Sequence, residues 1–337
     1  MHSDKRSLSL VRMLFAAAVF GWLLPGANAQ PGAADVFPSR PVRMIIPFPP
    51  GGGTDALARP IAQKLSELWG QQVIVDNRAG AGGIIGAQAT ARAAPDGYTF
   101  MLGTNGTHGI NQTLYPNLPY DTLRDFTAIT QVAIAPNILV IHPSVNVSSV
   151  QELIALAKAQ PGKLNYGSAG SGSNPHLAAE VFKKLAGVDI THVPYKGSGP
   201  ALTDLLAGQV QIMFANAPTV LGHIKAGRLR GLATTSAQKL PGLTVLAEFP
   251  TLAEAGLTGY EADTWYGVFG PAGLKGDVLK SLNAGLVKVL SLPEIREAFA
   301  RQGAEVVPNS PEAFSAILKA EIAKWAPVIR ESGAKVE

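Results

Sequence analysis

The sequence predicts an α/β protein of two lobes, with the second lobe inserted into the first. Strand-like and helix-like segments alternate over residues 42–102 and again over residues 150–234, which is the rhythm of βαβ units. Two β-rich segments, residues 129–142 and 260–269, bracket the second region. Because the chain leaves the first region once and returns once, we expect residues 36–135 and 265–337 to form the first lobe and residues 136–264 the second.

Apolar runs bounded by Gly, Ser, Thr or Asn mark the strands, and apolar residues at helical spacing mark the helices. In the first lobe we expect strands at 42–47, 72–75 and 98–102, and helices at 54–69, 84–94, 277–291, 293–302 and 311–332. In the second lobe we expect helices at 150–160, 176–186, 199–207 and 219–226, and strands at 164–167, 190–193, 210–214 and 229–234. Pro60 should kink or shorten the first helix. The alternation predicts mostly parallel sheets covered by helices.

The first 29 residues have the three parts of an export signal. Lys5, Arg6 and Arg12 form a basic head, residues 13–24 are apolar, and Ala27-Asn28-Ala29 closes the segment. The apolar run is shorter than the ~20 residues of a membrane-spanning helix. We therefore expect a signal peptide, residues 1–29, that is cleaved after Ala29 to release a soluble exported protein.

Composition excludes several classes of protein. A chain that is 47% hydrophobic and 15% charged is not disordered. Removing residues 1–29 leaves 25 basic and 23 acidic residues, and without a basic cluster we expect no nucleic-acid partner. The six histidines lack metal-binding spacing, so we expect no metal and no cofactor. The chain has no cysteine, so no disulfide supports its core.

The stretch "PFPPGGGTDALAR", which starts at Pro47, has the layout of an anion-binding loop between a strand and a helix. A P-loop is excluded because no lysine follows Gly53. A dinucleotide loop remains an alternative, since Gly51-x-Gly53-x-x-Ala56 and the later Asp76 fit its spacing. An exported dinucleotide-dependent oxidoreductase is therefore our second hypothesis, although Pro49-Pro50 removes two amides where a pyrophosphate would need them.

A small carboxylate is the first hypothesis for the ligand. Gly-, Ser- and Thr-rich loops follow three predicted strands, at residues 47–53, 103–109 and 167–176, and ligands of α/β sheets bind at such strand ends. Helix N-termini there offer free N–H groups to an anion without any Arg or Lys. His108 and His176 either contact the solute or pack within these loops. Ser168 lacks the G-x-S-x-G context of a nucleophile, so we expect no catalytic residue and no enzyme.

Several motifs together resemble the Bug/TctC family of solute receptors. They are "PFPPGGGTDALAR", "NRAGAGGIIGA", "APDGYT", "LPYDTLRDF", "KLNYGSAGSGSNPHLA", "HVPYKG" and "TWYGVFGPAG", in that order, and the similarity covers residues 37–337. The resemblance implies a two-lobed periplasmic binding protein of type 2, with two crossing strands between the lobes. It also implies a monomer that binds a small anionic solute, such as a di- or tricarboxylate or an aromatic acid. The solute would pass to the integral membrane subunits of a tripartite tricarboxylate transporter.

The resemblance also implies the residues of the ligand site. They are Phe48, Gly52, Gly53, Thr54 and Asp55 of the first loop, Thr104, Asn105 and Thr107 of the second loop, and Ser168, Gly170, Ser173, Tyr195 and Asn216 of the second lobe. Ala215 stands where relatives often carry Asp. If that Asp contacts a ligand amine, an amino-acid ligand is disfavoured here and a plain carboxylate or a neutral aromatic acid is favoured.

Overall fold

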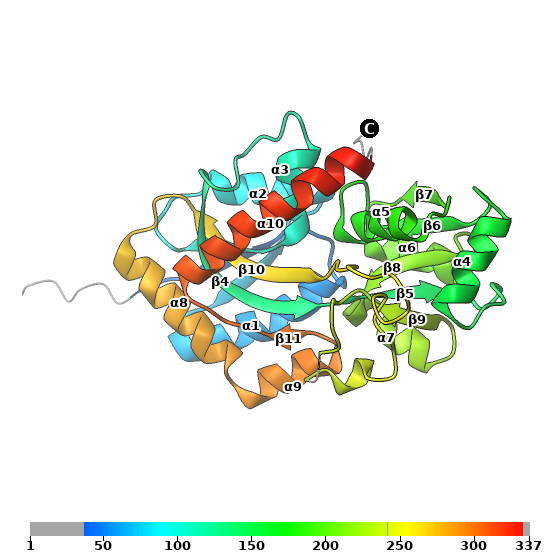
Figure 1. Cartoon of the computed structure of the whole chain (residues 1–337). Coiled ribbons are helices and arrows are strands. Elements are labelled where there is room, and N and C mark those ends of the chain that lie inside the picture. Colours follow the sequence, from blue (N-terminus) through cyan, green and yellow to red (C-terminus); the bar gives the residue numbers. More distant parts are fainter. Residues whose placement is uncertain (1–36, 241, 333–337) are drawn as a thin grey trace, which may run out of the picture. The chain divides into compact units, whose positions relative to one another are not determined.

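The structure is a computed structural model that describes residues 37–240 and 242–332. Its strands form two sheets, each flanked by helices (Figure 1). The first sheet has the order β11 (Glu305–Val306), β4 (Phe126–Ala135), β10 (Thr264–Pro271), β3 (Thr99–Thr104), β1 (Val42–Ile46) and β2 (Val73–Asn77). The second has the order β7 (Thr191–Pro194), β6 (Asn165–Ser168), β8 (Ile212–Asn216), β5 (Asn137–Ile141) and β9 (Arg230–Thr234). The predicted signal peptide, residues 1–29, lies outside the described residues.

The helices follow the predicted alternation with strands. They are α1 (Gly53–Trp69), α2 (Ile84–Ala91), α3 (Asn111–Leu114), α4 (Val150–Ala159), α5 (Asn174–Ala186), α6 (Ser198–Leu206), α7 (Ala217–Lys225), α8 (Gly276–Leu290), α9 (Pro293–Arg301) and α10 (Pro311–Ser332), with 3₁₀ turns η1 (Ala81–Gly83) and η3 (Thr244–Leu246) and a π-helical turn η2 (Gly106–Ile110). Among the described helices, none combines the length and apolar character needed to cross a membrane.

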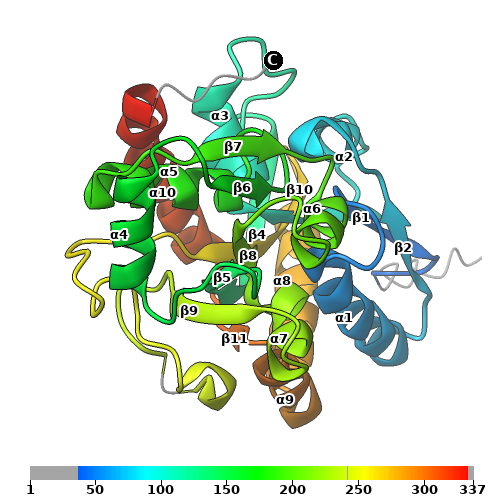
Figure 2. The same cartoon turned by 90° about the vertical axis from the view of Figure 1, so that its right-hand side faces the viewer.

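Each sheet has helices on both faces because successive side chains of a strand point in opposite directions. In the first sheet, Met44 packs toward α1, α8 and α9, whereas Ile45 packs toward α2 and α10. In the second sheet, Leu139 packs toward α4 and α5, whereas Ile138 packs toward α6 and α7. Figure 2 shows these two pairs of helices on either side of the strands.

The two segments that connect the sheets supply strands running against the others. Pro136, which cannot donate to a ladder, separates β4 in the first sheet from β5 in the second. β5 pairs antiparallel with β8 and β9, and β10 pairs antiparallel with β3 and β4. The pairs β1–β2, β1–β3, β6–β7 and β6–β8 are parallel. The prediction of parallel pairing is confirmed inside the βαβ units, and the connecting segments, which interrupt the βαβ rhythm, bring the antiparallel pairs.

Proline affects the helices less than the sequence predicts. α1 continues through Pro60 to Trp69, so the expected shortening is wrong. α5 and α7 begin two residues before their predicted starts, because Pro175 and Pro218 occupy the first turn, where a missing N–H costs no hydrogen bond. The strand β11 was not predicted.

The exact boundaries of the two lobes stay a prediction. The first sheet takes its strands from residues 42–135 and 264–306, and the second from residues 137–234. However, the chain from Phe37 onward clusters as one compact unit. α10 runs beside both sheets (Figure 1), with Phe314 in the core of the first and Trp325 in the core of the second. The predicted assignment of residues 311–332 to the first lobe alone therefore does not describe the packing of this helix.

Candidate functional site

A cavity of about 210 Å³ lies where parallel strands of both sheets end. Segments that follow β1, β3, β6, β7 and β8 form its wall, together with the first residues of β10. This is the place where α/β sheets bind ligands. The lining residues are Phe48, Pro49, Pro50, Gly51, Gly52, Gly53, Thr54, Gly82, Thr104, Asn105, Gly106, Ala169, Gly172, Ser173, Asn174, Pro175, Gly197, Ser198, Gly199, Pro200, Asn216, Thr264 and Tyr266.

The helices α1, α5, α6 and α7 all begin at the wall of this cavity. Their N-cap residues, Gly52, Ser173, Gly197 and Asn216, line it, and none of these four makes a side-chain capping hydrogen bond. The first N–H groups of a helix have no partner within the helix, and the helix dipole makes this end positive. Helices from both sheets therefore direct positive potential into the cavity.

No charged side chain among the described lining residues adds to this positive potential or opposes it. Among the described residues that line the cavity, there is no Lys, Arg, His, Asp or Glu. Burial raises the pKa of Tyr266, so its phenol stays neutral. Within the described part of the chain, no three His, Asp or Glu side chains converge as a metal site requires. The cavity suits a small anion and offers no carboxylate to an ammonium group.

Asp55 lies behind the first loop and not in the cavity wall. Its carboxylate accepts hydrogen bonds from the Gly51 amide (3.0 Å), from Arg59 Nε and Nη2 (2.9 Å each) and from Asn77 Nδ2 (3.0 Å). Burial acts to raise the pKa of Asp55, but these hydrogen bonds together hold it below its usual value. Asn77 also donates to the Phe48 carbonyl (3.0 Å). Asp55 therefore positions the loop that carries Gly52 and Gly53 (both in the wall).

The second predicted loop coils into η2, and this moves part of it away from the cavity. Thr104 and Asn105 line the wall, but Thr107 does not. The Thr107 hydroxyl donates to the Thr104 carbonyl and lies 3.0 Å from the Thr104 amide, which donates to it. His108 stacks on Phe269 with ring centroids 3.8 Å apart, and burial lowers its pKa to about 3. Of the two roles left open for His108, the structure shows packing.

In the third predicted loop, Ser173 lines the cavity, whereas Ser168 and Gly170 lie behind it. Ser168 Oγ is 2.6 Å from His192 Nε2 and accepts a hydrogen bond from the Gly170 amide at 3.1 Å. Gly170 has φ +125°, and a Cβ there would stand 3.0 Å from the Tyr195 carbonyl oxygen. The glycine therefore permits close packing of two neighbouring loops.

Tyr195 and His176 also lie outside the wall. The Tyr195 hydroxyl donates to Asp204 (2.7 Å), and His176 Nδ1 accepts from the Gly172 amide (3.0 Å). Burial lowers the pKa of His176 to about 4, so it too packs as a neutral ring. Ala215 lies in the apolar core of the second sheet, away from the wall.

Asn216 belongs to a hydrogen-bond network of side-chain amides and one threonine hydroxyl. Asn216 Nδ2 donates to Asn137 Oδ1 (3.0 Å) and to Thr264 Oγ1 (2.7 Å), and Thr264 Oγ1 donates to Asn174 Oδ1 (3.1 Å). Asn137 Nδ2 also donates to Asn174 Oδ1. These contacts join β5, β8 and α5 of the second sheet to β10 of the first at one side of the cavity.

Several lining residues were missed in the sequence. The segment from Gly197 to Pro200 follows β7 and repeats the Gly/Ser pattern of the other loops, so the same signal could have found it. Asn174 was missed because the predicted helix begins at residue 176, after Pro175. Tyr266 stands within a strand, where nothing in the local sequence marks it.

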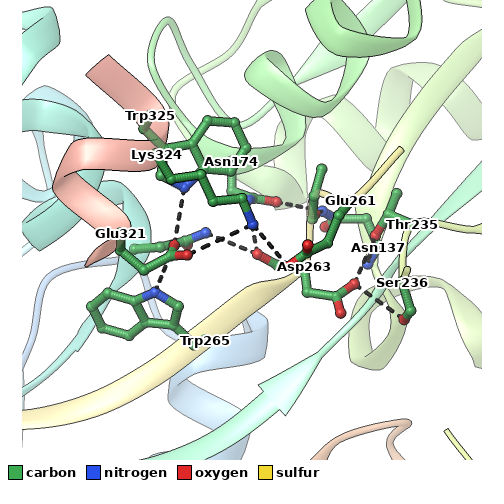
Figure 3. A network of polar contacts seen from close by, with 12 residues as sticks. Asn137, Asn174, Thr235, Ser236, Glu261, Asp263, Trp265, Glu321, Lys324 and Trp325 are labelled. Carbon is green, nitrogen blue, oxygen red and sulfur yellow. Dashed lines mark hydrogen bonds and ion pairs between the residues drawn. The ribbon is translucent and has the colours of Figure 1, made fainter. Parts of the chain in front are cut away.

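Asp263 lies where the chain returns to the first sheet (Figure 3). Its main-chain carbonyl accepts from Asn105 Nδ2 (2.9 Å) and Asn174 Nδ2 (3.1 Å), residues that line the cavity from the two lobes. Its carboxylate accepts from the hydroxyls of Thr235 and Ser236, each at 3.2 Å. Burial raises the pKa of Asp263 to about 6, and these hydroxyls only partly oppose the rise.

The substitution Asp263→Asn should therefore stabilise the protein at pH 7.5. Because the folded-state pKa of Asp263 is raised to about 6, folding favours the neutral carboxyl group over the charged one. The stability that Asp263 contributes is therefore present below the unfolded pKa and is lost as the pH rises through 6. Asn keeps the main-chain contacts and avoids the buried charge. We expect a gain of up to about 2 kcal/mol at pH 7.5, allowing for partial exposure, that vanishes near pH 4. Urea unfolding at both pH values measures it. A loss of stability at pH 7.5 would show that the ionised form is needed, for example by Lys324.

Glu321 of α10 accepts hydrogen bonds from two tryptophans in the same region (Figure 3). Its Oε2 accepts from the indole Nε1 of Trp265 and of Trp325, each at 3.0 Å. Trp265 belongs to the core of the first sheet and Trp325 to that of the second. Trp265 is a buried core residue, since it is 5% exposed.

The chain is similar to known solute-binding proteins over nearly its whole length. Protein BugT of Bordetella pertussis is 40% identical over 331 residues, which is 98% of this chain and 100% of BugT. The structure of R. palustris Rpa4515 with adipate is 40% identical with a TM-score of 0.85, covering 89% of this chain and 100% of that one. MatC from Rhodopseudomonas palustris, solved with bound malate, is 31% identical with a TM-score of 0.81, covering 87% and 100%.

Residues 57–334 match the family described as "Tripartite tricarboxylate transporter family receptor". This match and the structural neighbours confirm the resemblance and the two-lobed fold of a periplasmic binding protein. The chain therefore belongs to the TctC family of tripartite tricarboxylate transporter receptors, which includes the Bug proteins.

Proposed function

We propose that this protein is a periplasmic receptor that encloses a small carboxylate between its two lobes without chemical conversion. The observation that carries the proposal is the convergence of the uncapped N-termini of α1, α5, α6 and α7 on one cavity, whose described lining residues include no charged side chain. Hydrogen bonds to a charged group contribute about 1.5–3 kcal/mol each, so three or four would reach micromolar affinity. Backbone amides and the hydroxyl of Thr54 would hold the carboxylate.

The other predicted contacts, Phe48, Gly52, Gly53, Thr104, Asn105 and Asn216, lie in the same wall and support this assignment. Asp55, Thr107, Ser168, Gly170 and Tyr195 would support the loops from behind. The adipate of Rpa4515 and the malate of MatC favour a dicarboxylate. The absence of an acidic side chain among the described lining residues disfavours an amino acid.

An exported dinucleotide-dependent oxidoreductase, the alternative function, has less support. Asp76, the candidate ribose ligand, pairs with Arg43 Nη1 (2.8 Å) and Arg78 Nε (2.9 Å) and is not in the cavity wall. The cavity of about 210 Å³ is also smaller than the roughly 300–1,000 Å³ typical of sites for drug-sized ligands.

A thermal-shift screen tests the proposal with adipate, malate, citrate, benzoate, an amino acid and NADH. We expect a carboxylate without an ammonium group to stabilise the protein by about 2.7 kcal/mol at 100 times its Kd. Isothermal titration of the best compound should then give saturable binding to one site. Saturable binding of NADH, with no response to any carboxylate, would favour the oxidoreductase.

We further propose that the protein acts as a periplasmic monomer and delivers its solute to integral membrane transporter subunits. Family membership supports a transporter partner. Cell fractionation and the N-terminal mass of the exported protein test the localisation and the predicted cleavage after Ala29. Gel filtration with light scattering tests the monomer.

A further inference from the structure

Tyr266 lines the cavity, and its hydroxyl forms no hydrogen bond with any described residue. It is 1% exposed, and its ring packs into the apolar core of the first sheet. In β10 it pairs with Thr104, the last residue of β3, which also lines the cavity. No described residue hydrogen-bonds its hydroxyl, and burial is the single cause that raises its pKa.

The Tyr266 hydroxyl is also not sealed inside the core. Sealed side-chain atoms without a partner do occur among the described residues, for example His108 Nε2 and Thr122 Oγ1, but the Tyr266 hydroxyl is not one of them. Because Tyr266 lines the cavity and is otherwise buried, the cavity is the space from which a partner can reach this oxygen. A nearly buried phenol without a partner is unfavourable, so the site is suited to an acceptor that the solute brings.

Four other polar side chains that line the cavity already hydrogen-bond within the protein. The Asn216 side-chain amide donates to the Thr264 hydroxyl, which in turn donates to Asn174 Oδ1. The Ser173 hydroxyl donates to the Gly170 carbonyl (2.7 Å). Tyr266 therefore differs from them: its donor is free, neutral and held by a packed ring. Such a phenol can donate to an oxygen acceptor, whereas it forms no hydrogen bond with a methyl group.

We propose that the Tyr266 hydroxyl is a specificity-determining donor that reads a second oxygen group of the solute, beyond the carboxylate held at the helix N-termini. This inference rests on the proposed function and deepens it. The substrate class becomes a bifunctional acid, such as a dicarboxylate, in preference to a monocarboxylate with an apolar tail. A site that hydrogen-bonds a substrate group rejects the analogue without it, because the site's own polar group is then left unpaired.

Tyr266→Phe tests this by titration calorimetry with two matched pairs of acids, adipate with hexanoate and succinate with butyrate. Each pair has the same carbon chain and differs by one carboxylate. We expect the wild type to prefer the dicarboxylate. The substitution should weaken dicarboxylate binding roughly ten- to a hundredfold and change monocarboxylate binding less than about twofold.

Tyr260→Phe is the matched control, because the Tyr260 hydroxyl donates to the Ala178 carbonyl (2.6 Å) and does not line the cavity. It should lower the melting temperature of the unliganded protein by about 2–4 °C and leave the affinities unchanged. Tyr266→Phe should leave that temperature unchanged or raise it, because no hydrogen bond to a described residue is lost.

The outcomes separate this inference from the proposed function. If the wild type binds neither dicarboxylate nor any acid of the screen, the proposed function fails. If the wild type binds a dicarboxylate and Tyr266→Phe binds it equally well, the receptor function stands and the role of Tyr266 is wrong. An equal loss for both members of a pair would place Tyr266 at the first carboxylate and would also overturn the inference.

Discussion

Gly53→Val should abolish carboxylate binding while the protein stays folded. Gly53 is the first residue of α1 and lines the cavity, so a branched side chain there separates the amides of α1 from the solute. We expect the affinity for the best acid of the screen to fall at least about a hundredfold. Stability should change by less than about 1 kcal/mol, since Val has no lower helix propensity than Gly. Calorimetric titration and urea unfolding measure the two effects.

Gly276→Val is the matched control for this experiment. Gly276 is likewise the first residue of a helix, α8, with open space where a Cβ would stand, and it is not in the cavity wall. The control should bind the acid with wild-type affinity. If Gly53→Val also keeps that affinity, the first glycine loop does not form the carboxylate site.

Asp55→Asn should destabilise the protein and weaken binding, although Asp55 does not touch the cavity. The Asp55 side chain is 4% exposed, and its carboxylate accepts hydrogen bonds from Gly51, Arg59 and Asn77. The substituted asparagine has a neutral amide with one acceptor oxygen, so it cannot replace the charged carboxylate for all of these donors. We expect a loss of about 2–3 kcal/mol in the free energy of unfolding. The affinity should fall about tenfold because the Gly51 amide is no longer held in place.

The stability effect of Asp55→Asn should depend on pH. The folded-state pKa of Asp55 is lowered, so its stabilising contribution is present above the unfolded pKa and lost as the pH falls through the folded value. The difference from wild type should be largest near neutral pH and shrink below about pH 4. Asp76→Asn is the control, because Asp76 also forms ion pairs with arginine but accepts no hydrogen bond from a described residue of the first glycine loop. Unchanged affinity in Asp55→Asn would show that Asp55 does not position the loop.

The order of strands and helices could be predicted because it depends on local periodicity and on Gly and Ser at strand ends. α1, for example, starts at Gly53, one residue before its predicted start at residue 54. The starts of α5 and α7 were placed too late, because Pro175 and Pro218 read as boundaries when they stand inside the first turn.

The placement of site residues was less predictable. Thr104 and Thr107 belong to the same polar segment, yet only Thr104 lines the cavity, because η2 turns Thr107 back toward β3. Ser168 and Ser173 flank one loop, and only Ser173 faces the cavity. In such segments the direction of each side chain depends on how the backbone coils, and that in turn depends on packing against other elements.

The sequence by itself determined the kind of site in this protein: three strand ends rich in glycine or hydroxyl residues, each followed by a helix, with no Lys or Arg in the three predicted loops. Only the tertiary structure decided which of these ends meet, since that depends on contacts between residues far apart in the chain. It brought Tyr266 to the wall beside Thr104, and it withdrew Asp55 behind the loop that this residue supports. A local pattern specifies hydrogen-bonding groups, whereas long-range packing sets where they point.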